Sequence, residues 1–487
     1  MTTSLKNKAL KGFSWIFVGT LGQNFLQLLS LMVLARLLTP DEFGVVSVAL
    51  VIIGFLRIFT ELGVGPAVVQ RLELTKSHIS TANTLAVTLG VIVSLLLYLS
   101  ANEISLFFNM SELERVVKVL SLMIPASSLA VVGQSLLQRT LKFREIAIYN
   151  FLSFFVGYAC IAVPMALLEC GVWSLVFAHL GQITAMNLIV HVVVKEANYY
   201  GFNLRSAKDL LGYGVGYSLA RLSNFIAGEG DNIVVGKFLG ASALGIYSNS
   251  YRLMLFPASL IGGVIDKVLF PILSNMQGDK GRISKVYIDI LSIATMLLVP
   301  VSIYLYFFAN EIIVLVLGMQ WGDAVIVFQL LIIVLSFRLN YKFSDLLAAA
   351  LGAVYRRANR QIIYALAVIL GAYVGHFFGV EGVAVGVGFA IMLNYVVMLQ
   401  LSQSLIGFSW VDVALMHFKQ LCIALPIILF TYLSRRYFFD GIESSLFILF
   451  FSGFLFFLTT LLIWLVFAKT MKREIAIFKF TLSRFLR

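Results

Sequence analysis

The chain has 487 residues, of which 60% are hydrophobic and 12% are charged, and its formal net charge is +12. Soluble domains carry about 25% charged residues, so this composition and a mean hydropathy of +0.96 exclude a soluble globular protein. The three cysteines are scattered and have neither the spacing of a metal site nor that of a disulfide framework.

Apolar stretches recur along the chain at about the 20 residues that a membrane-spanning helix needs. In chain order they cover residues 12–38, 43–59, 78–101, 116–137, 146–168, 172–194, 210–235, 244–270, 284–309, 325–351, 362–378, 383–405, 415–437 and 446–467. They predict an all-α integral membrane protein with about 14 transmembrane helices. The first stretch is too long for a signal peptide and lacks a cleavage site, so we expect it to be retained.

Residues 35–49 recur in altered form at residues 236–250, with a constant offset of 201 residues. Arg36 corresponds to Lys237, Gly44 to Gly245 and Ser47 to Ser248. The offset spans six predicted helices, which returns the chain to the same side of the membrane and makes the two copies parallel. The sequence therefore predicts a six-helix lobe over 1–200, a second over 206–405, two extra transmembrane helices over 412–467, and a basic amphipathic cytoplasmic tail over 468–487.

Basic residues are distributed unevenly between the two sides of this topology. The termini and the even-numbered loops carry 25 lysines and arginines, whereas the odd-numbered loops carry 5. The positive-inside rule then places both termini in the cytoplasm. The net charge thus indicates topology and contact with anionic membrane lipids. We expect no nucleic-acid partner, because no nucleic-acid motif accompanies the charge.

Five basic residues lie deep in predicted spans, where each costs roughly 2.5–3.5 kcal/mol. They are Arg57, Arg221, Arg252, Arg338 and Lys342. They must face water or a partner, and we predict that they bind substrate in a cationic cavity. For two of them an ion pair on the same helix is the alternative. Glu61 lies four residues after Arg57, and Asp345 lies three residues after Lys342.

Other polar residues in the spans are candidates for cavity or ion-coupling roles. They are Gln23, Asn24, Gln27, Glu61, Glu229, Asp231 and Asp345. The amides of the first helix suit a hydroxyl-rich cargo, or equally hydrogen bonds to neighbouring helices. The sequence has no catalytic carboxylate pair, nucleophile or metal constellation, and no Walker A loop. We therefore expect no enzyme activity, metal or cofactor.

Two motifs carry a family resemblance. Leu34-Ala-Arg-Leu-Leu-Thr-Pro-Asp-Glu-Phe-Gly44, followed by Glu61-Leu-Gly-Val-Gly-Pro-Ala-Val-Val-Gln-Arg71, resembles the polysaccharide transporter family, and residues 139–144 and 246–252 add to it. These bacterial flippases of lipid-linked oligosaccharides belong to the multidrug/oligosaccharidyl-lipid/polysaccharide exporter superfamily. The similarity is greatest to the colanic-acid and teichuronic-acid exporters.

The resemblance implies two six-helix bundles around a V-shaped central cleft, with two further helices. It implies that an undecaprenyl-diphosphate-linked repeat unit moves from the cytoplasmic to the outer leaflet of the cell (inner) membrane by alternating access. The product would be an exopolysaccharide, capsule or O-antigen, with polymerase or export machinery as partners. Arg252 lies in a family motif and is the most direct candidate for the substrate site.

Three other functions stay open. One is an ion-coupled drug or lipid II exporter of the same superfamily, for which the acidic residues would carry the ion. Another is a membrane glycosyltransferase or polymerase, suggested by Asp41 and Glu42 in the first outer loop. The corresponding loop of the second copy has Ser242 and Ala243, so these acids are not required by the repeat. The third is a scaffold for polysaccharide assembly.

Overall fold

The structure is a computed structural model that describes residues 2–61, 63–276, 278–439, 442 and 444–467. The described chain consists of helices joined by short turns, with no β-strand in these ranges. An apolar chain in lipid must bond each backbone N–H and C=O within its own segment, which a helix does. The predicted all-α class is confirmed, and the predicted tail over 468–487 lies outside the described residues.

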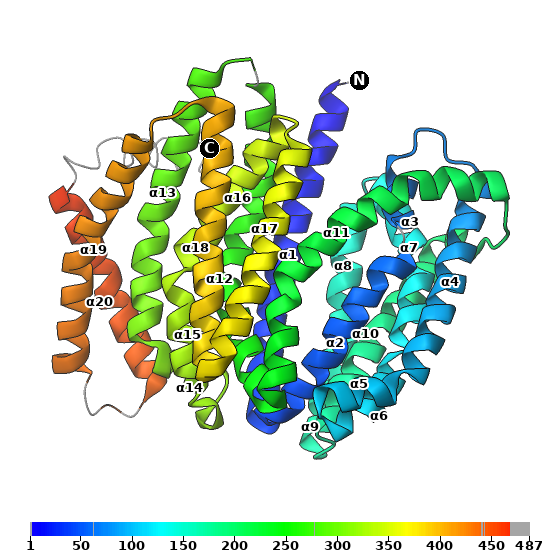
Figure 1. Cartoon of the computed structure of the whole chain (residues 1–487), viewed down its shortest axis with the longest axis horizontal. Helices are drawn as coiled ribbons and strands as arrows, with labels where there is room; N and C mark the ends of the chain where they lie inside the picture. Colours follow the sequence, from blue (N-terminus) through cyan, green and yellow to red (C-terminus); the bar gives the residue numbers. More distant parts are fainter. Residues whose placement is uncertain (1, 62, 277, 440–441, 443, 468–487) are drawn as a thin grey trace. The chain divides into compact units, whose positions relative to one another are not determined.

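The helices divide into two compact units, Met1–Ser248 and Asn249–Arg487. Figure 1 labels the helices of both. The first unit contains α1 (Thr2–Leu37), α2 (Pro40–Glu61), α3 (Val64–Gln70), α4 (Lys76–Leu99), α5 (Ala101–Phe108), α6 (Ser111–Leu120), α7 (Met123–Arg139), α8 (Phe143–Phe154), the π-helix η1 (Phe155–Ala162), α9 (Val163–Leu167), α10 (Val172–Val193), the short η2 (Lys195–Asn198) and α11 (Leu204–Phe238).

Helix α12 (Gly240–Asn275) begins in the first unit and continues in the second. The second unit then contains α13 (Lys280–Phe307), α14 (Ala309–Val316), η3 (Met319–Trp321), α15 (Ala324–Ile333), α16 (Leu335–Ala350), α17 (Val354–Gly375), η4 (His376–Phe378), α18 (Gly379–Ile406), α19 (Trp410–Phe438) and α20 (Ser445–Val466).

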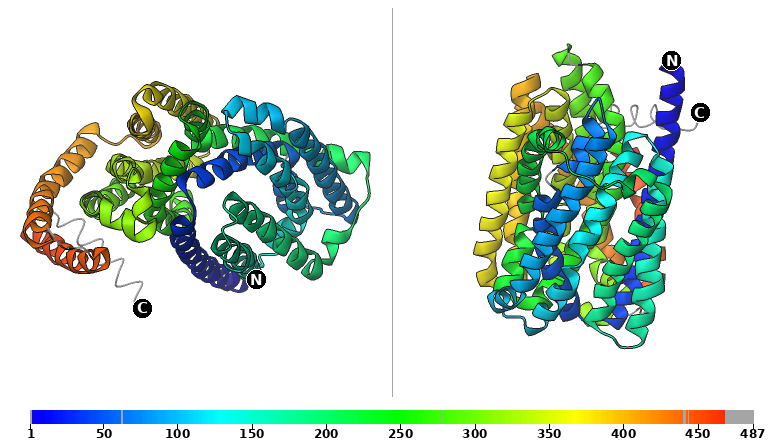
Figure 2. Two further views of the ribbon diagram at one scale, coloured as in Figure 1. Left: turned by 90° about the horizontal axis from the view of Figure 1, so that it is seen from below. Right: turned by 90° about the vertical axis from the view of Figure 1, so that its right-hand side faces the viewer.

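Helix α2 lies in the interior of the first unit. It packs against α4, α6, α7, α10 and α11, and the end-on view in Figure 2 shows neighbouring helices of this unit running in a similar direction. Val45, Val46, Val48 and Ile53 are all buried. An apolar helix face in a membrane protein contacts either lipid or other helices, and the burial of these side chains shows that α2 contacts mainly other helices.

The two copies of the sequence repeat pack directly against each other within the first unit, at the starts of α2 and α12. A Cβ atom on Gly44 would overlap the backbone carbonyl of Ala241, and a Cβ on Gly245 would overlap the backbone carbonyl of Pro40. The two contacts are equivalent under the 201-residue offset: Gly44 corresponds to Gly245, and Pro40 corresponds to Ala241. The repeat found in the sequence therefore forms a local pseudo-twofold contact, which only glycine permits at both positions.

In the second unit, α17 and α18 form an antiparallel hairpin with a glycine-lined seam. Gly371 faces Gly386 and Gly375 faces Gly382, each close enough that a Cβ would overlap the opposite backbone. Gly379, at the turn, has a φ of 77°, a value that favours glycine. Small residues at such a seam let helix backbones approach closely in a membrane.

All fourteen predicted apolar stretches fall on a helix or on a run of consecutive helices. By length and apolar composition, nine of the described helical segments are able to span a bilayer. The number rises to ten when α15 and α16, bent by 44°, count as one span. One of the nine, Val354–Ile406, is the α17–α18 hairpin, and the described apolar part of α1 is only Leu21–Leu37. Fourteen membrane crossings therefore stay a prediction.

Candidate functional site

In the first unit, Glu61 lies between two arginines. Arg57 Nη2 lies 2.9 Å from Glu61 Oε1 on the same helix, and Arg221 Nη1 of α11 contacts Glu61 Oε2. The Glu61 side chain is 12% exposed, whereas both arginines are more than one third exposed. We call these three residues the Glu61 cluster. Two guanidinium groups share one carboxylate, so the cluster keeps one net positive charge.

This geometry settles the local pairing that the sequence left open. Arg57 and Glu61 form the pair expected from their spacing. Arg221, for which the sequence offered no obvious local partner, also contacts Glu61, through a helix 160 residues away in the chain. Arg57 Nε is buried and has no hydrogen-bond partner within the described residues, so the shared carboxylate does not use every donor of the cluster.

In the second unit, Arg338 of α16 is a half-buried cation without a salt bridge to any described acid. Its Cζ lies 5.1 Å from the ring centroid of Tyr341 and 6.0 Å from that of Tyr364. Nε and Nη1 are both buried and have no hydrogen-bond partner in the described part of the chain. Aromatic faces stabilise a guanidinium by cation–π attraction, and here the Nε and Nη1 donors stay unused within the described residues.

The alternative pairing of Lys342 with Asp345 is wrong. Asp345 instead binds Arg357 of α17 through both carboxylate oxygens, with Oδ2 at 2.7 Å from Nη2 and Oδ1 in contact with Nε. The planar guanidinium matches a carboxylate bidentately, which a lysine ammonium does not. Lys342 is thereby left without a salt bridge within the described residues.

The other predicted cation, Arg252, is exposed on α12 and has no described partner. The acids of α11 lie in the first unit. Glu229 accepts a hydrogen bond from Asn232 Nδ2 at 2.7 Å, and Asp231 accepts one from the Tyr247 hydroxyl at 2.6 Å. Asp231 is 3% exposed, so it is a buried acid held by a neutral donor.

The first unit also contains an amide-lined pocket of about 320 Å³ between α1, α7 and α8. Gln23, one of the candidate cavity residues, lines it together with Gln134, Gln138 and Asn150. Asn24 and Gln27 are not among its lining residues. The sequence analysis did not single out the α7 and α8 amides, although the four-residue spacing of Gln134 and Gln138 places them on one helix face.

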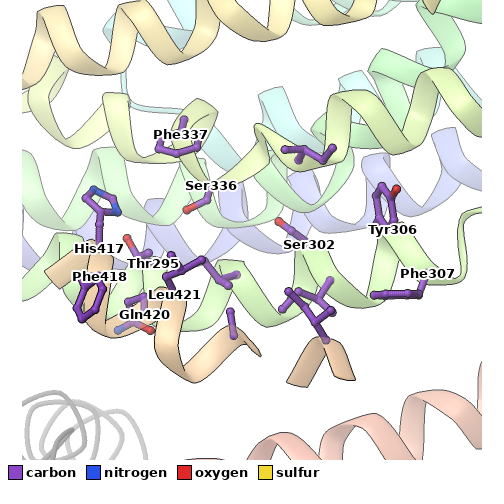
Figure 3. Close-up of a pocket in the computed structure, with 15 residues that line it drawn as sticks. Thr295, Ser302, Tyr306, Phe307, Ser336, Phe337, His417, Phe418, Gln420 and Leu421 are labelled. Atoms are coloured by element: carbon purple, nitrogen blue, oxygen red, sulfur yellow. The ribbon is translucent and has the colours of Figure 1, made fainter. Parts of the chain in front are cut away.

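The second unit has a larger apolar pocket of about 730 Å³, lined from α13, α15, α16 and α19. Figure 3 shows its lining side chains. The polar side chains labelled there are Thr295, Ser302, Tyr306, Ser336, His417 and Gln420. A neighbouring pocket of about 490 Å³ lies between α13 and α19 and is lined by charged residues. No group of three or more potential metal ligands occurs within the described residues.

Comparison with known proteins identifies relatives of this architecture. Residues 33–326 match the profile of the family described as polysaccharide biosynthesis protein. The succinoglycan biosynthesis transport protein ExoT of Rhizobium meliloti (strain 1021) is 29% identical over 331 residues, which are 66% of each chain. The teichuronic acid biosynthesis protein TuaB of Bacillus subtilis (strain 168) is 26% identical over 411 residues, covering 82% of this chain and 85% of TuaB.

Among solved structures, the lipid II flippase MurJ in its inward closed conformation has a similar fold. The TM-score is 0.76 at 16% identity, over 94% of this chain and 99% of that one. This likeness confirms the multi-pass membrane fold, and the motif resemblance to polysaccharide transporters is confirmed as well. Because the family profile covers more than half of the chain, the protein belongs to the polysaccharide biosynthesis protein family.

Proposed function

We propose that this protein is a flippase that carries an undecaprenyl-diphosphate-linked oligosaccharide repeat unit from the cytoplasmic to the outer leaflet by alternating access. The family, a relative named as a transport protein and the flippase-type fold support transport rather than enzymatic chemistry. The excess of basic residues at the termini and even-numbered loops supports cytoplasmic termini in a bacterial inner membrane. The repeat unit would serve exopolysaccharide, capsule or O-antigen synthesis.

The proposal rests mainly on the guanidinium of Arg338. A charged side chain inside a membrane protein is costly, by roughly 2.5–3.5 kcal/mol at the bilayer centre on insertion scales. Arg338 has no acidic partner within the described residues, and two of its nitrogens have unused donors. An anion that arrives with the cargo would supply the missing charge. A diphosphate suits this role because guanidinium groups bind phosphate bidentately.

The Glu61 cluster is a second anion site of a different kind. Its two arginines are already oriented by one carboxylate, and the net positive charge attracts a further anion. We propose that a diphosphate competes with Glu61 for the arginines, so that binding and release exchange one anion for another. When the diphosphate leaves, Glu61 pairs again with both arginines. The two cations are therefore never left together in the membrane without an anion.

The amide pocket supports a role for the sugar part of the cargo. Amides both donate and accept hydrogen bonds, as sugar hydroxyl groups do. Gln23, Gln134, Gln138 and Asn150 offer four such groups around about 320 Å³. We propose that they contact hydroxyl groups of the oligosaccharide and not its phosphates.

The test is transport in a deletion strain that expresses the full chain or a variant. Arg338→Ala should cause the lipid-linked oligosaccharide to accumulate on the cytoplasmic face, while membrane levels of the protein stay normal. Arg338→Lys should restore only part of transport, because lysine keeps the charge but not the bidentate geometry. Arg356→Ala is the matched control, since Arg356 is an exposed arginine of the same unit that bonds Ser404. Wild-type export by Arg338→Ala would overturn the proposal.

A lipid II exporter is the second candidate, and the similarity of the fold to MurJ favours it. In that case Asp231 of α11 is the candidate ion-coupling group among the predicted acids, because its side chain is buried at 3% exposure and it can exchange an ion between the two states of the transporter. Expression in cells depleted of their lipid II flippase separates the candidates. Rescue of growth would support lipid II export. Failure of rescue, with restored polysaccharide export in the deletion strain, would support the oligosaccharide flippase.

A further inference from the structure

The charged pocket and the apolar pocket of the second unit succeed each other along the same two helices. On α13 the charged pocket ends at Ser292 and the apolar pocket begins at Thr295. On α19 Lys419 lines the charged pocket and the adjacent Gln420 lines the apolar one. Because α13 and α19 pack together, the two pockets follow each other along the same helix pair, and we call the pair of pockets the α13–α19 groove.

One end of the α13–α19 groove carries balanced charge. Lys285 and Asp289 come from α13, and Asp412 and Lys419 come from α19. Two positive and two negative groups cancel, in contrast to the net positive Glu61 cluster and to Arg338. A diphosphate would meet as much repulsion as attraction here. A headgroup with one phosphate and one ammonium would find a partner of opposite sign for each.

The next part of the groove offers an unused hydrogen-bond donor. Gln420 is only 4% exposed, and its Nε2 has no hydrogen-bond partner within the described residues. An unsatisfied buried polar group is costly, so a ligand that accepts a hydrogen bond at this depth would relieve it. Beyond Gln420 the lining is mostly apolar, with Val299, Ile303 and Leu421 (Figure 3 labels Leu421).

The order of charge, hydrogen-bond donor and apolar surface matches a glycerophospholipid, which has a charged headgroup, ester carbonyls and acyl chains in that order. The length agrees as well. From Lys285, at the charged end, to Val299 in the apolar pocket, α13 rises by about 21 Å at 1.5 Å per residue. One leaflet with its headgroups is about 20–22 Å thick. The groove can therefore follow one lipid from its headgroup into its chain.

We propose that the α13–α19 groove is a binding site for a zwitterionic glycerophospholipid of the phosphatidylethanolamine type. Asp412 holds the ammonium, Lys285 holds the phosphate, Gln420 Nε2 donates to an ester carbonyl, and the apolar pocket takes an acyl chain. This lipid is a resident ligand of the second unit and not the transported cargo. The inference goes beyond the proposed function and holds for any cargo.

The experiment measures lipids retained by the purified full chain in native mass spectrometry. The probes are phosphatidylethanolamine and phosphatidylglycerol, each as a diester and as a dialkyl ether. The diester phosphatidylethanolamine should be retained about tenfold better than phosphatidylglycerol. The ether analogue should be retained about two- to tenfold less, the usual range for one hydrogen bond.

Variants assign each contact. Lys285→Gln and Asp412→Asn should each lower phosphatidylethanolamine retention by about tenfold, as expected for a lost charged hydrogen bond. Arg282→Gln removes a charge three residues from Lys285, outside the pocket lining, and should have no effect. Gln420→Met keeps the side-chain length and should erase the preference for ester over ether while leaving the headgroup preference intact.

Three results would each overturn the proposal. Equal retention of phosphatidylglycerol would remove the headgroup assignment. An unchanged ester preference in Gln420→Met would remove the carbonyl contact. Displacement of phosphatidylethanolamine by the lipid-linked oligosaccharide, in proportion to its concentration, would make the groove part of the cargo site. The transport assay of Arg338→Ala tests the cargo site alone, and the retention assay tests the lipid site alone. Either proposal can therefore fail while the other stands.

Discussion

The hydroxyl oxygens of Ser47 and Ser248 lie 3.4 Å apart, although the two residues are separated by 201 positions in the chain. This separation is the offset of the sequence repeat, so each serine contacts its own counterpart. A residue that meets its counterpart lies on the local pseudo-twofold axis. Gly44 and Gly245 lie on either side of this contact, each against the opposite turn. The duplication is thus also a packing interface within the first unit.

The first prediction concerns these glycines. Gly44→Ala and Gly245→Ala should each destabilise the protein by about 1–3 kcal/mol, because the added methyl group meets backbone that has no room to yield. The measurement is the thermal midpoint of the purified protein in detergent. Gly228→Ala is the control: a Cβ there meets nothing within 4 Å, and alanine is the better helix former. An equal response of all three variants would contradict the packing argument.

The second prediction concerns the Glu61 cluster. Glu61→Gln should bind the lipid-linked oligosaccharide more tightly and release it more slowly, because two arginines lose their shared counter-charge. Arg57→Gln and Arg221→Gln should bind it more weakly. The loss of stability should be small, about 1 kcal/mol or less for each pair, since both arginines are more than one third exposed.

Substrate binding to the purified variants and turnover in proteoliposomes test this prediction together. Weaker binding by Glu61→Gln would show that the carboxylate supports the bound anion and does not compete with it. Arg71→Gln serves as a charge control in the same unit, because Arg71 pairs with Asp209 and not with Glu61.

The third prediction concerns the choice of Arg357 over Lys342 by Asp345. In a double-mutant cycle, Asp345→Ala and Arg357→Ala should be non-additive by about 1 kcal/mol or more, as residues in direct contact are. Asp345→Ala and Lys342→Ala should be additive within about 0.5 kcal/mol. Thermal midpoints of the four proteins in each cycle provide the measurement. Strong coupling to Lys342 would restore the pairing expected from the sequence.

These sites show what a sequence can and cannot determine here. Apolar runs of sufficient length located the helices, because lipid leaves the backbone no other structure over such lengths. The i,i+4 rule found the pair of Arg57 and Glu61, since both partners share one helix. The constant offset of the repeat identified the two segments that meet at Ser47 and Ser248. In each case the information was local or periodic.

Contacts between distant helices were not accessible in the same way. Arg221 reaches Glu61 from a helix 160 residues away, and Arg357 reaches Asp345 across a turn. The three-residue spacing permits Lys342 to pair with Asp345, but Asp345 pairs with Arg357 instead. The pockets between α13 and α19 join residues more than 100 positions apart, and no periodicity links them. The arrangement of two six-helix lobes around a cleft stays a prediction.

The last prediction concerns acid stability at Asp209, which precedes the predicted span over 210–235. Arg71 Nη2 lies 2.8 Å and His78 Nε2 lies 3.4 Å from Asp209 Oδ2. The hydrogen bond from His78 and then the charge of Arg71 lower the pKa of the Asp209 carboxyl below its ordinary 3.8. A carboxyl with a lowered pKa stabilises the fold at pH values above its pKa in the unfolded chain, and this contribution is lost as the pH falls through its pKa in the folded protein.

Asp209→Asn should therefore lower the thermal midpoint at pH 7, and the difference from the wild type should shrink below about pH 4 and vanish at lower pH. Glu73→Gln is the control, because Glu73 is an exposed acid nearby whose side chain has no described partner, and it should change neither value. A gap between Asp209→Asn and the wild type that stayed constant from neutral to acid pH would mean that packing, and not the charge of Asp209, holds this contact together.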